Sequence, residues 1–479
     1  MGMFAPIRQV GGILDLGLGL RWEPATLAGE VARRAAALSH IGIGRGSLVA
    51  IAHDGSARFF ADLLAVWTVG AAAACLDIKL TAPEFKTLVE FMAPAAILID
   101  RDIVAAAAEI PVLRLADSRD ADVAAPECEL DDPALVLFTS GTTGAPKGVV
   151  LTFRALFARW SLNVAAIGVR TLARTLVTLP AHFGHGLIGN ALTPLLNGAN
   201  IVLYPRDMAL AQNLGRIIDE HGITFLSSVP ALWSLALKLG NPPETGSLAR
   251  VHVGSAPLSS KLWSDIAGWS RAEVVNCYGM TETANWIAGA SSADGIEDGL
   301  VGKPWGGTAA VVGESGAPRA TGEGEIVLQS PSLMAGYFRR PDLTAEVLHG
   351  GWFHTGDRGV IDRSGNIRIT GRLKDEINRA GFKVQPAEID RLIESHPAVR
   401  RACVFGLADG AGGESVAAAV ALAEGARETA ETLRAWCERR LRREAVPERW
   451  FFVADLPHNA RGKIDREAVR RMLVKDALP

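Results

Sequence analysis

The sequence predicts an α/β fold: a large N-terminal domain of layered α/β subdomains with a small barrel-like β subdomain, and a small α+β C-terminal domain. The chain has 479 residues, more than one hydrophobic core usually holds, so two or more domains are expected. Apolar strands alternate with helical segments up to about Val301, which is typical of layered α/β architecture. The pattern changes after Val301 and again after Arg372.

The N-terminal part begins with an amphipathic helical pattern over residues 26–38, which ends before Gly42. A second, buried helix is expected over 59–69. Short apolar runs predict strands, and the run over 135–138 leads directly into a loop rich in Thr, Ser and Gly. The strands expected in this part are 47–52, 71–76, 95–99, 111–115, 135–138, 200–203, 224–227, 251–253 and 274–276.

Residues 301–370 are rich in glycine and have turn sequences at 314–316 and 363–366, so they predict small antiparallel or barrel-like sheets. A compact α+β segment of roughly a hundred residues follows, which is enough for a small core of its own. We therefore predict two domains, 1–372 and 373–479. The elements expected in the second domain are helices at 388–395 and 431–443 and strands at 402–407, 415–423 and 450–453.

The composition excludes several classes of protein. Hydrophobic residues make up 49% of the chain and the formal net charge is −3, so no basic surface for nucleic acid is expected. The five cysteines show no CxxC pair, which disfavours a disulfide framework or a zinc site. The longest apolar run, 63–76, is shorter than the ~20 residues of a membrane-spanning helix, and residues 1–10 lack a secretory-signal pattern. We expect a cytoplasmic protein without a membrane span or a nucleic-acid partner.

The strongest local signal is the loop that follows the strand at 135–138. Its three glycines allow backbone N–H groups to converge on an anion, its four hydroxyls add donors, and Lys147 adds a mobile positive charge. A Walker P-loop does not fit, because Gly148 follows Lys147 where Ser or Thr is needed. A flexible surface turn is the alternative, and this density of donors and glycines disfavours it. The loop consists of Thr139, Ser140, Gly141, Thr142, Thr143, Gly144, Ala145, Pro146, Lys147 and Gly148.

This loop resembles the phosphate-binding signature of the adenylate-forming superfamily, which contains acyl-CoA synthetases, nonribosomal-peptide adenylation domains and firefly-type luciferases. Further segments are similar to other signatures of that family, in the family's order and spacing, and the resemblance extends over about 26–466. It implies an AMP-forming carboxylate–CoA ligase, whose first domain binds AMP and whose second domain is a mobile lid. The further segments are 253–258, 276–283, 351–357, 371–375 and 456–466.

The resemblance implies a role for each nucleotide-binding segment. Tyr278 would stack on adenine, Thr281 would bond the α-phosphate, and Glu282 would be a Mg²⁺ ligand. Asp357 would bind both ribose hydroxyls, and Arg372 would contact ribose and phosphate. The nucleotide-binding residues that the resemblance implies are Thr139, Ser140, Gly141, Thr142, Thr143, Gly144, Lys147, Gly254, Ser255, Ala256, Pro257, Asn276, Cys277, Tyr278, Gly279, Met280, Thr281, Asp357 and Arg372.

Taken one at a time, these segments have ordinary explanations. The Thr281–Glu282 pair resembles a helix N-cap followed by a first-turn acid, and residues 253–258 resemble a strand-to-helix turn. The Gly-Asp sequence at 356–357 fits a simple turn, and 371–375 fits a solvated run of charges. The functional interpretation depends on all the signatures occurring together in one chain.

The resemblance also implies a catalytic mechanism in two half-reactions. In the first, a carboxylate attacks the α-phosphate of Mg·ATP and pyrophosphate leaves. In the second, a thiol attacks the acyl-adenylate after the C-terminal domain has rotated about Lys374. Gly381 would line the tunnel for the thiol arm, although a plain turn glycine is the alternative. The implied catalytic residues are Lys463, Thr142, Lys147 and Phe183.

The class of the carboxylic acid substrate is limited mainly by what the sequence excludes. Relatives that activate amino acids place an Asp in the segment after Pro180, and none occurs over 180–190, so an α-amino acid is disfavoured. Cys277 stands where many relatives have Gly and would shorten the pocket. We expect a small or medium aliphatic or aromatic acid, and we interpret His182 and His185 as satisfied loop histidines. The predicted pocket residues are Phe183, Gly254 and Cys277, and Trp233 and Trp286 are candidate apolar walls or ordinary core.

Two questions stay open at this level. The expected co-substrates are ATP, Mg²⁺, a carboxylic acid and CoA, but the phosphopantetheine arm of an acyl carrier protein could replace CoA, because both thiols end in the same arm. A non-catalytic nucleotide-binding regulator is a third interpretation, which the presence of Lys147, Glu282, Asp357, Arg372 and Lys463 disfavours. A monomer or homodimer is expected.

Overall fold

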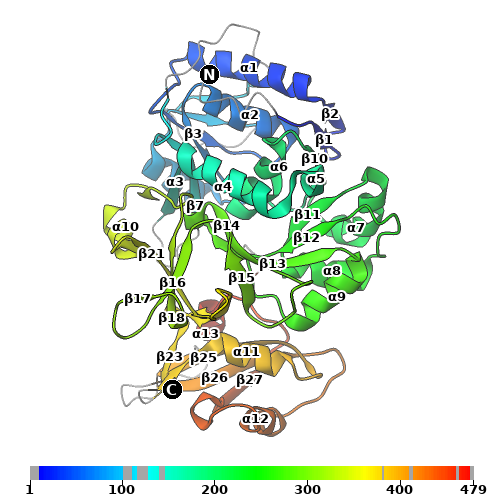
Figure 1. Cartoon of the computed structure of the whole chain (residues 1–479), viewed down its shortest axis with the longest axis vertical. Coiled ribbons are helices and arrows are strands. Elements are labelled where there is room, and N and C mark those ends of the chain that lie inside the picture. The colour runs from blue at the N-terminus through cyan, green and yellow to red at the C-terminus, as the bar shows by residue number, and fades with distance from the viewer. Residues whose placement is uncertain are drawn as a thin grey trace. The chain divides into compact units, whose positions relative to one another are not determined.

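The computed structural model of the chain describes residues 10–100, 110–115, 128–139, 146–379, 382–408, 414–459 and 463–474. Figure 1 shows its helices and strands. The chain forms two compact units. The first comprises Met1–Glu297, Val301–Thr308 and Leu328–Phe353, and the second comprises Asp298–Leu300, Ala309–Val327 and His354–Pro479.

One sheet of the first unit has seven strands in the order β19-β8-β7-β4-β3-β5-β6. Strands β3 to β7 lie parallel, so their connections must cross over from one end of the sheet to the other. Strands β7 and β8 are antiparallel, and their last pair is Thr139 opposite Lys147. The strands are β3 (Leu48–Ile51), β4 (Ala72–Cys75), β5 (Ala96–Leu98), β6 (Val112–Leu113), β7 (Pro133–Thr139), β8 (Lys147–Thr152) and β19 (Gly336–Tyr337).

A second set of strands in this unit follows the order β15-β14-β13-β12-β11-β9-β10-β1-β2. Strands β1, β10, β9, β11, β12 and β13 run parallel to one another, and β14 turns back antiparallel to β13. The strands are β1 (Ile13–Asp15), β2 (Leu20–Trp22), β9 (Arg174–Val177), β10 (Asn200–Leu203), β11 (Phe225–Ser228), β12 (Arg250–Val253), β13 (Glu273–Met280), β14 (Asn285–Ser291) and β15 (Leu300–Pro304).

The helices of this unit begin where the sequence offers capping groups. Ser56 accepts from the backbone of Phe59 to start α2, and Asp207 accepts from two amides to start α7. Gly222 ends α7 at φ +56°, a conformation that suits glycine. The helices are α1 (Pro24–His40), α2 (Ala57–Thr68), α3 (Ala82–Met92), α4 (Phe153–Ile167), α5 (Val169–Leu172), the π-helix η3 (His185–Leu192), α6 (Thr193–Leu195), α7 (Met208–His221), α8 (Pro230–Leu239), α9 (Ser260–Ser270), the 3₁₀ turn η4 (Thr281–Thr283) and α10 (Pro341–Val347).

The second unit contains a β-rich part followed by a small α+β part. In the first, strands follow the order β17-β16-β18-β21-β22; in the second, β25, β26 and β27 form a sheet. The elements are β16 (Thr308–Val312), β17 (Pro318–Arg319), β18 (Gly322–Gln329), β21 (Trp352–Ile361), β22 (Ile367–Arg372), η5 (Leu373–Asp375), β23 (Ile377–Arg379), β24 (Phe382–Val384), α11 (Pro386–Glu394), β25 (Val399–Ala408), β26 (Glu414–Leu422), α12 (Ala430–Glu438), η6 (Arg443–Ala445), β27 (Arg449–Phe452) and α13 (Arg466–Val474).

The predicted α/β class with a large N-terminal and a small C-terminal part is confirmed, while the domain boundary at 372/373 stays a prediction. The helix expected over 431–443 is wrong in its second half. It ends at Glu438, and Arg442 already has an extended backbone, with ψ 150°, before the 3₁₀ turn η6. The short strand expected over 274–276 continues to Met280. No helix among the described ranges is long and apolar enough to cross a membrane.

A buried ion cluster ties α1 to α2 in the first unit. Arg34 Nε donates to Asp62 Oδ1 at 2.7 Å, and the two side chains are only 1% and 4% exposed. The second oxygen of Asp62 lies 2.9 Å from Nε2 of the buried His53. Asp62 therefore serves two buried partners, and Glu30 is the other acid that Arg34 reaches.

Replacing Asp62 with Asn should lower the free energy of unfolding by about 3 kcal/mol, because the buried guanidinium of Arg34 then loses the negative charge of Asp62. The matched control is Asp265→Asn, whose partner Lys261 is 84% exposed and whose loss should cost about 0.5 kcal/mol or less. Chemical denaturation of the full chain, followed by fluorescence, measures both. Equal losses in the free energy of unfolding would show that the buried cluster stabilises the fold no more than an exposed ion pair does.

Candidate functional site

Four parallel strands of the first unit end at one edge, and the predicted site residues follow these ends. Ser227 of β11 pairs with Val177 of β9, and Val253 of β12 pairs with Asn276 of β13, so the strands finish nearly level. Ligands of open α/β sheets bind beyond the carboxyl ends of such strands. The segment 254–258 leaves β12 at this edge, which makes it the first place to look for a site.

The segment 276–283 forms the end of β13 and a tight turn. Gly279 is required there, because a Cβ added to it would lie 2.2 Å from the carbonyl oxygen of Asn285 on β14. The turn is the three-residue 3₁₀ element η4, so Thr281 does not begin an α-helix as an ordinary N-cap would. The Thr283 hydroxyl accepts from the Met280 amide at 3.1 Å and thereby closes the turn.

Lys147, Glu282 and Tyr337 form a compact polar cluster. Lys147 Nζ lies 3.6 Å from Glu282 Oε1 and 4.0 Å from the centre of the Tyr337 ring. The Tyr337 hydroxyl donates to the same Oε1 at 2.9 Å. Burial and the neighbouring Glu282 charge raise the pKa of Tyr337, so it stays a donor. The structure thus brings together two predicted site residues that are far apart in sequence.

Tyr337 was not predicted from the sequence. It lies on β19, which pairs with β8, and the backbone of Phe338 donates to the carbonyl of Gly148 at 2.7 Å. This pairing carries the ring to Lys147 at the start of β8. Nothing in the local sequence around Tyr337 signals the contact, because only the strand pairing creates it.

The predicted phosphate loop connects β7 to β8. Ser140, Gly141, Thr142, Thr143 and Gly144 lie outside the described residues, and Thr139 is described through its backbone pairing with Lys147. Both ends of the loop are therefore fixed on one antiparallel hairpin.

The predicted pocket residues lie next to one another at the strand ends. A Cβ added to Gly254 would lie 3.0 Å from the Cys277 carbonyl oxygen and 3.5 Å from Cε1 of His185. Cys277 is buried in a cluster with Phe225 and Trp286, and burial raises the pKa of its thiol well above the usual value. Its side chain therefore behaves as a small apolar group that fills space.

The segment before η3 carries the other predicted pocket residue. Phe183 bonds Pro180 through its amide, and its ring lies 4.4 Å from that of His182. His182 in turn lies 3.4 Å from Asp77. A Cβ added to Gly184 would lie 4.0 Å from Cα of Thr281, so this segment adjoins the turn η4.

The two tryptophans considered as pocket walls differ in their surroundings. Trp286 belongs to the buried cluster around Cys277 and contacts His185 edge-on at 5.3 Å. Trp233 is fully buried on α8, beside Trp269. Trp286 thus lies with the pocket residues, and Trp233 packs in the helical layer.

In the second unit, Asp357 and Arg372 face each other across β21 and β22. Arg372 Nε lies 2.8 Å from Asp357 Oδ1, and the Asp357 side chain is 4% exposed whereas that of Arg372 is 48% exposed. The Asp357 amide also donates to the Thr355 hydroxyl at 3.0 Å. The Asp357 carboxylate is thus buried and paired with the half-exposed guanidinium of Arg372.

The predicted hinge and lysine loop share a polar connection within the second unit. Arg466 follows the loop of Lys463, and it reaches Asp375 at 3.4 Å, next to the exposed Lys374. It also pairs with Asp390 of α11 and donates to the Val404 carbonyl at 2.6 Å. Gly381, predicted for the thiol tunnel, lies outside the described residues.

The Lys463 loop itself is closed by short-range bonds. His458 and Ile464 form a β-bridge, the Asn459 amide donates to the Lys463 carbonyl at 2.8 Å, and the Lys463 amide donates to Asn459 Oδ1 at 3.2 Å. Asn459 therefore holds the base of the loop with its side chain and backbone together.

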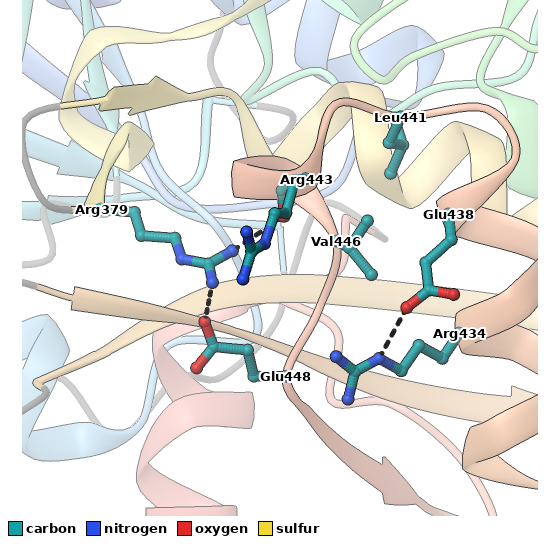
Figure 2. Close-up of a pocket in the computed structure, with 7 residues that line it drawn as sticks. All are labelled: Arg379, Arg434, Glu438, Leu441, Arg443, Val446 and Glu448. Carbon is teal, nitrogen blue, oxygen red and sulfur yellow. Dashed lines mark hydrogen bonds and ion pairs between the residues drawn. The ribbon is translucent and has the colours of Figure 1, made fainter.

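A cavity of about 630 Å³ lies in the second unit, and Figure 2 shows its lining. Two of its arginines are paired with acids: Arg379 pairs with Glu448, and Arg434 Nε donates to Glu438 at 3.0 Å. Arg379 also donates to the carbonyl of Glu444 at 2.8 Å. The cavity therefore lies among β23, α12 and η6, and none of the predicted site residues that the structure describes lines it.

Two family models match the chain. The model of the AMP-binding enzyme family matches residues 22–338, and the model of the AMP-binding enzyme C-terminal domain matches residues 388–463. Together they include the strand-end site, the polar cluster and the Lys463 loop.

Several curated proteins are similar along most of their length. A sulfoacetate–CoA ligase of Cupriavidus necator is 36% identical over 354 residues, 73% of this chain and 69% of the relative. An oxalate–CoA ligase of Arabidopsis thaliana is 32% identical over 460 residues, 90% of this chain and 89% of the relative. A 2-succinylbenzoate–CoA ligase of Bacillus cereus is 31% identical over 445 residues, 91% of this chain and 90% of the relative.

Solved structures agree with these matches. ATP-bound MatB from Rhodopseudomonas palustris superposes with a TM-score of 0.89 at 27% identity, covering 97% of this chain and 96% of that one. The o-succinylbenzoate CoA synthetase of Bacillus subtilis, in complex with its acyl-adenylate intermediate, gives 0.85 at 25% identity, covering 96% of this chain and 94% of that one.

Proposed function

Because this chain belongs to the AMP-binding enzyme family and is an AMP-forming acid–thiol ligase, we propose that it activates a short carboxylic acid with Mg·ATP and transfers the acyl group to CoA. The observation that carries this proposal is the Lys147–Glu282–Tyr337 cluster beside the pocket of Gly254 and Cys277. Glu282 follows β13, whereas Lys147 and Tyr337 lie on β8 and β19 of the seven-stranded sheet, so their contact brings groups suited to phosphate to the end of β13.

In the first half-reaction, a carboxylate oxygen attacks the α-phosphorus and pyrophosphate leaves. Lys147 would bind phosphate oxygens with its ammonium, and Thr281, on the turn after β13, would donate its hydroxyl to the α-phosphate. Lys463 would neutralise charge that develops where the carboxylate meets the phosphate. The protein's contribution is therefore to position the reactants and to compensate charge.

Glu282 fits the role of a magnesium ligand. The Tyr337 hydroxyl donates to Oε1, and Lys147 lies near the same oxygen. Hard carboxylate oxygens suit Mg²⁺, which commonly takes one or two carboxylates and completes its shell with water and substrate phosphates. The ion would supply positive charge to the phosphate oxygens. Tyr337 would keep Oε1 occupied and so orient the carboxylate.

Asp357 and Arg372 support binding of the ribose. The buried Asp357 carboxylate can accept hydrogen bonds from two adjacent hydroxyls, a geometry in which charge-assisted bonds are strong. Arg372 is half-exposed, so its guanidinium can reach a phosphate while remaining near the acid. We propose the same roles for this pair that the family resemblance implies.

In the second half-reaction, the thiol of CoA attacks the acyl carbonyl and AMP leaves. We propose that the C-terminal domain rotates about Lys374 between the steps, as a hinge in which few residues absorb the change. Gly381 would leave space for the pantetheine arm, and Phe183 would move as the thiol enters. A carrier-protein arm in place of CoA remains an alternative acceptor.

Two observations support a short acid. The Cys277 side chain is part of the buried cluster of Phe225 and Trp286 and adjoins Gly254, so a longer acid bound at Gly254 would lack space there. Sulfoacetate and oxalate, which appear in the names of two relatives, are two-carbon acids. The substrate proposed here is therefore smaller than the medium-length acids that the sequence also allows.

ATP–pyrophosphate exchange across a panel of two- to eight-carbon acids tests the proposal. At least one short acid should support exchange, and added CoA should then yield an acyl thioester, AMP and pyrophosphate. A chain that exchanges with none of the acids would be a nucleotide binder and not a ligase.

Replacing Lys463 with Ala should lower acid-dependent exchange by about 100-fold or more, because one charge at the reacting centre is lost. Thiolysis of a supplied acyl-adenylate should change less than about threefold. Lys238→Ala, an exposed lysine at the end of α8, is the control and should affect neither step. Equal loss in both half-reactions would contradict a separate role for Lys463.

Replacing Tyr337 with Phe should raise the Mg²⁺ concentration needed for half-maximal exchange by about tenfold, because the hydrogen bond that orients Glu282 is removed while the ring remains. Tyr204→Phe, at the partly buried tyrosine that directly follows β10, is the matched control and should leave the Mg²⁺ requirement unchanged. An unaltered Mg²⁺ requirement in the Tyr337 variant would show that this hydroxyl does not support the metal ligand.

A further inference from the structure

The imidazole of His185 is held between two serine hydroxyls at the strand edge. Its Nδ1 lies 2.7 Å from Oγ of Ser255, and its Nε2 lies 2.6 Å from Oγ of Ser227. The Trp286 ring supports it edge-on at 5.3 Å. Ser227 belongs to β11, Ser255 follows β12, and His185 begins η3, so three elements fix the orientation of one side chain.

His252, in the same layer, is a useful contrast. It is fully buried, burial lowers its pKa well below the usual value, and neither nitrogen has a partner among the described residues. Its ring packs against Phe225 at 4.9 Å and Trp286 at 4.7 Å. His252 is therefore a packing residue. His185 is only partly buried and is hydrogen-bonded at both nitrogens, which a packing role does not require.

The hydrogen-bond accounting shows what the triad of His185, Ser227 and Ser255 can offer. Ser227 is fully buried, and its hydroxyl also has the carbonyl oxygen of His252 at 3.4 Å as an acceptor, so its proton is not available to a ligand. A neutral imidazole donates through one nitrogen and accepts at the other, so the Ser255 proton is left for another acceptor when Nδ1 donates. The triad can therefore present one O–H donor, that of Ser255.

His185 and Ser255 are partly buried, whereas Ser227 is fully buried. Gly254 adjoins both His185 and Cys277, as the contacts of an added Cβ show, and Cys277 shares a buried cluster with Trp286. An acid bound at Gly254 with its reacting carboxylate toward the phosphate side would therefore end close to His185 and Ser255. A methyl end would leave the Ser255 hydroxyl without an acceptor, whereas an anionic end would accept its proton.

We propose that His185, with Ser227 and Ser255, is a specificity-determining group that binds a second anionic oxygen group, such as a carboxylate or sulfonate, at the far end of a short acid. This inference rests on the proposed ligase activity and names its substrate class. The Ser255 hydroxyl donates to the anion, and Ser227 fixes the orientation of the His185 ring behind it.

Matched acids test this specificity in the full-length enzyme. Malonate is compared with propionate, and succinate with butyrate, by kcat/KM in ATP–pyrophosphate exchange; each pair differs by a carboxylate in place of a methyl group. In at least one of the two pairs, kcat/KM for the diacid should exceed that for the monocarboxylic acid by about 100-fold or more. A site built for hydrogen bonds rejects an analogue that lacks them.

His185→Phe keeps a ring against Trp286 and removes both nitrogens, so the diacid preference should fall by about 100-fold. Ser227→Ala removes one hydroxyl and should lower the preference by about tenfold, which keeps the test decisive if the first variant does not fold. His252→Phe is the matched control, the same substitution in the same layer, and should keep the preference.

The possible outcomes distinguish a wrong assignment of the triad from a wrong assignment of the ligase activity. Exchange with monocarboxylic acids at kcat/KM values equal to those of the diacids would overturn the assignment of the triad and leave the ligase intact. A diacid preference that persists in both His185→Phe and Ser227→Ala would also overturn it. Exchange with no acid at all would remove the proposed function itself, and this inference with it.

Discussion

The parallel alignment of β9, β11, β12 and β13 is the constraint on which the strand-end site depends. Because these strands point the same way and end nearly level, segments distant in sequence emerge at a single edge. Ser227, Gly254 and Cys277 meet there for that reason alone. The antiparallel return of β14 then places Glu282 on a tight turn at the same edge, and Gly279 makes the turn possible by admitting the backbone of Asn285.

A single carboxylate oxygen organises the phosphate side of this edge. Oε1 of Glu282 accepts from the Tyr337 hydroxyl and lies near Lys147, so one oxygen connects η4, β19 and β8. The Tyr337 hydroxyl donates to Glu282, and the face of its ring contacts the Lys147 ammonium. In the second unit, one side chain also connects several segments. Arg466, which follows Lys463, pairs with Asp375 beside the expected hinge residue and with Asp390 of α11.

The sequence predicted the fold class and the enzyme class because both follow from local patterns. Strand–helix alternation and short signatures need no knowledge of long-range contacts, and the structure and the relatives confirm them. It could not predict Tyr337 or the His185 triad, since these arise from strand pairing between distant segments. His185 was interpreted as a satisfied loop histidine, and it is satisfied; what the sequence could not show is that its partners are serines at two strand ends. The end of α12 was missed because the chain becomes extended at Arg442 within a good helical sequence.

The central claim is that a carboxylate oxygen attacks the α-phosphorus of ATP, and isotope transfer tests this most directly. An acid labelled with ¹⁸O in both carboxylate oxygens is converted to its thioester, and the nucleotide and phosphate products are examined by mass spectrometry. The mechanism places one ¹⁸O atom in the phosphate of AMP for each turnover, since the attacking oxygen leaves with AMP. Label in inorganic phosphate together with ADP would indicate attack at the γ-phosphorus and would contradict the account.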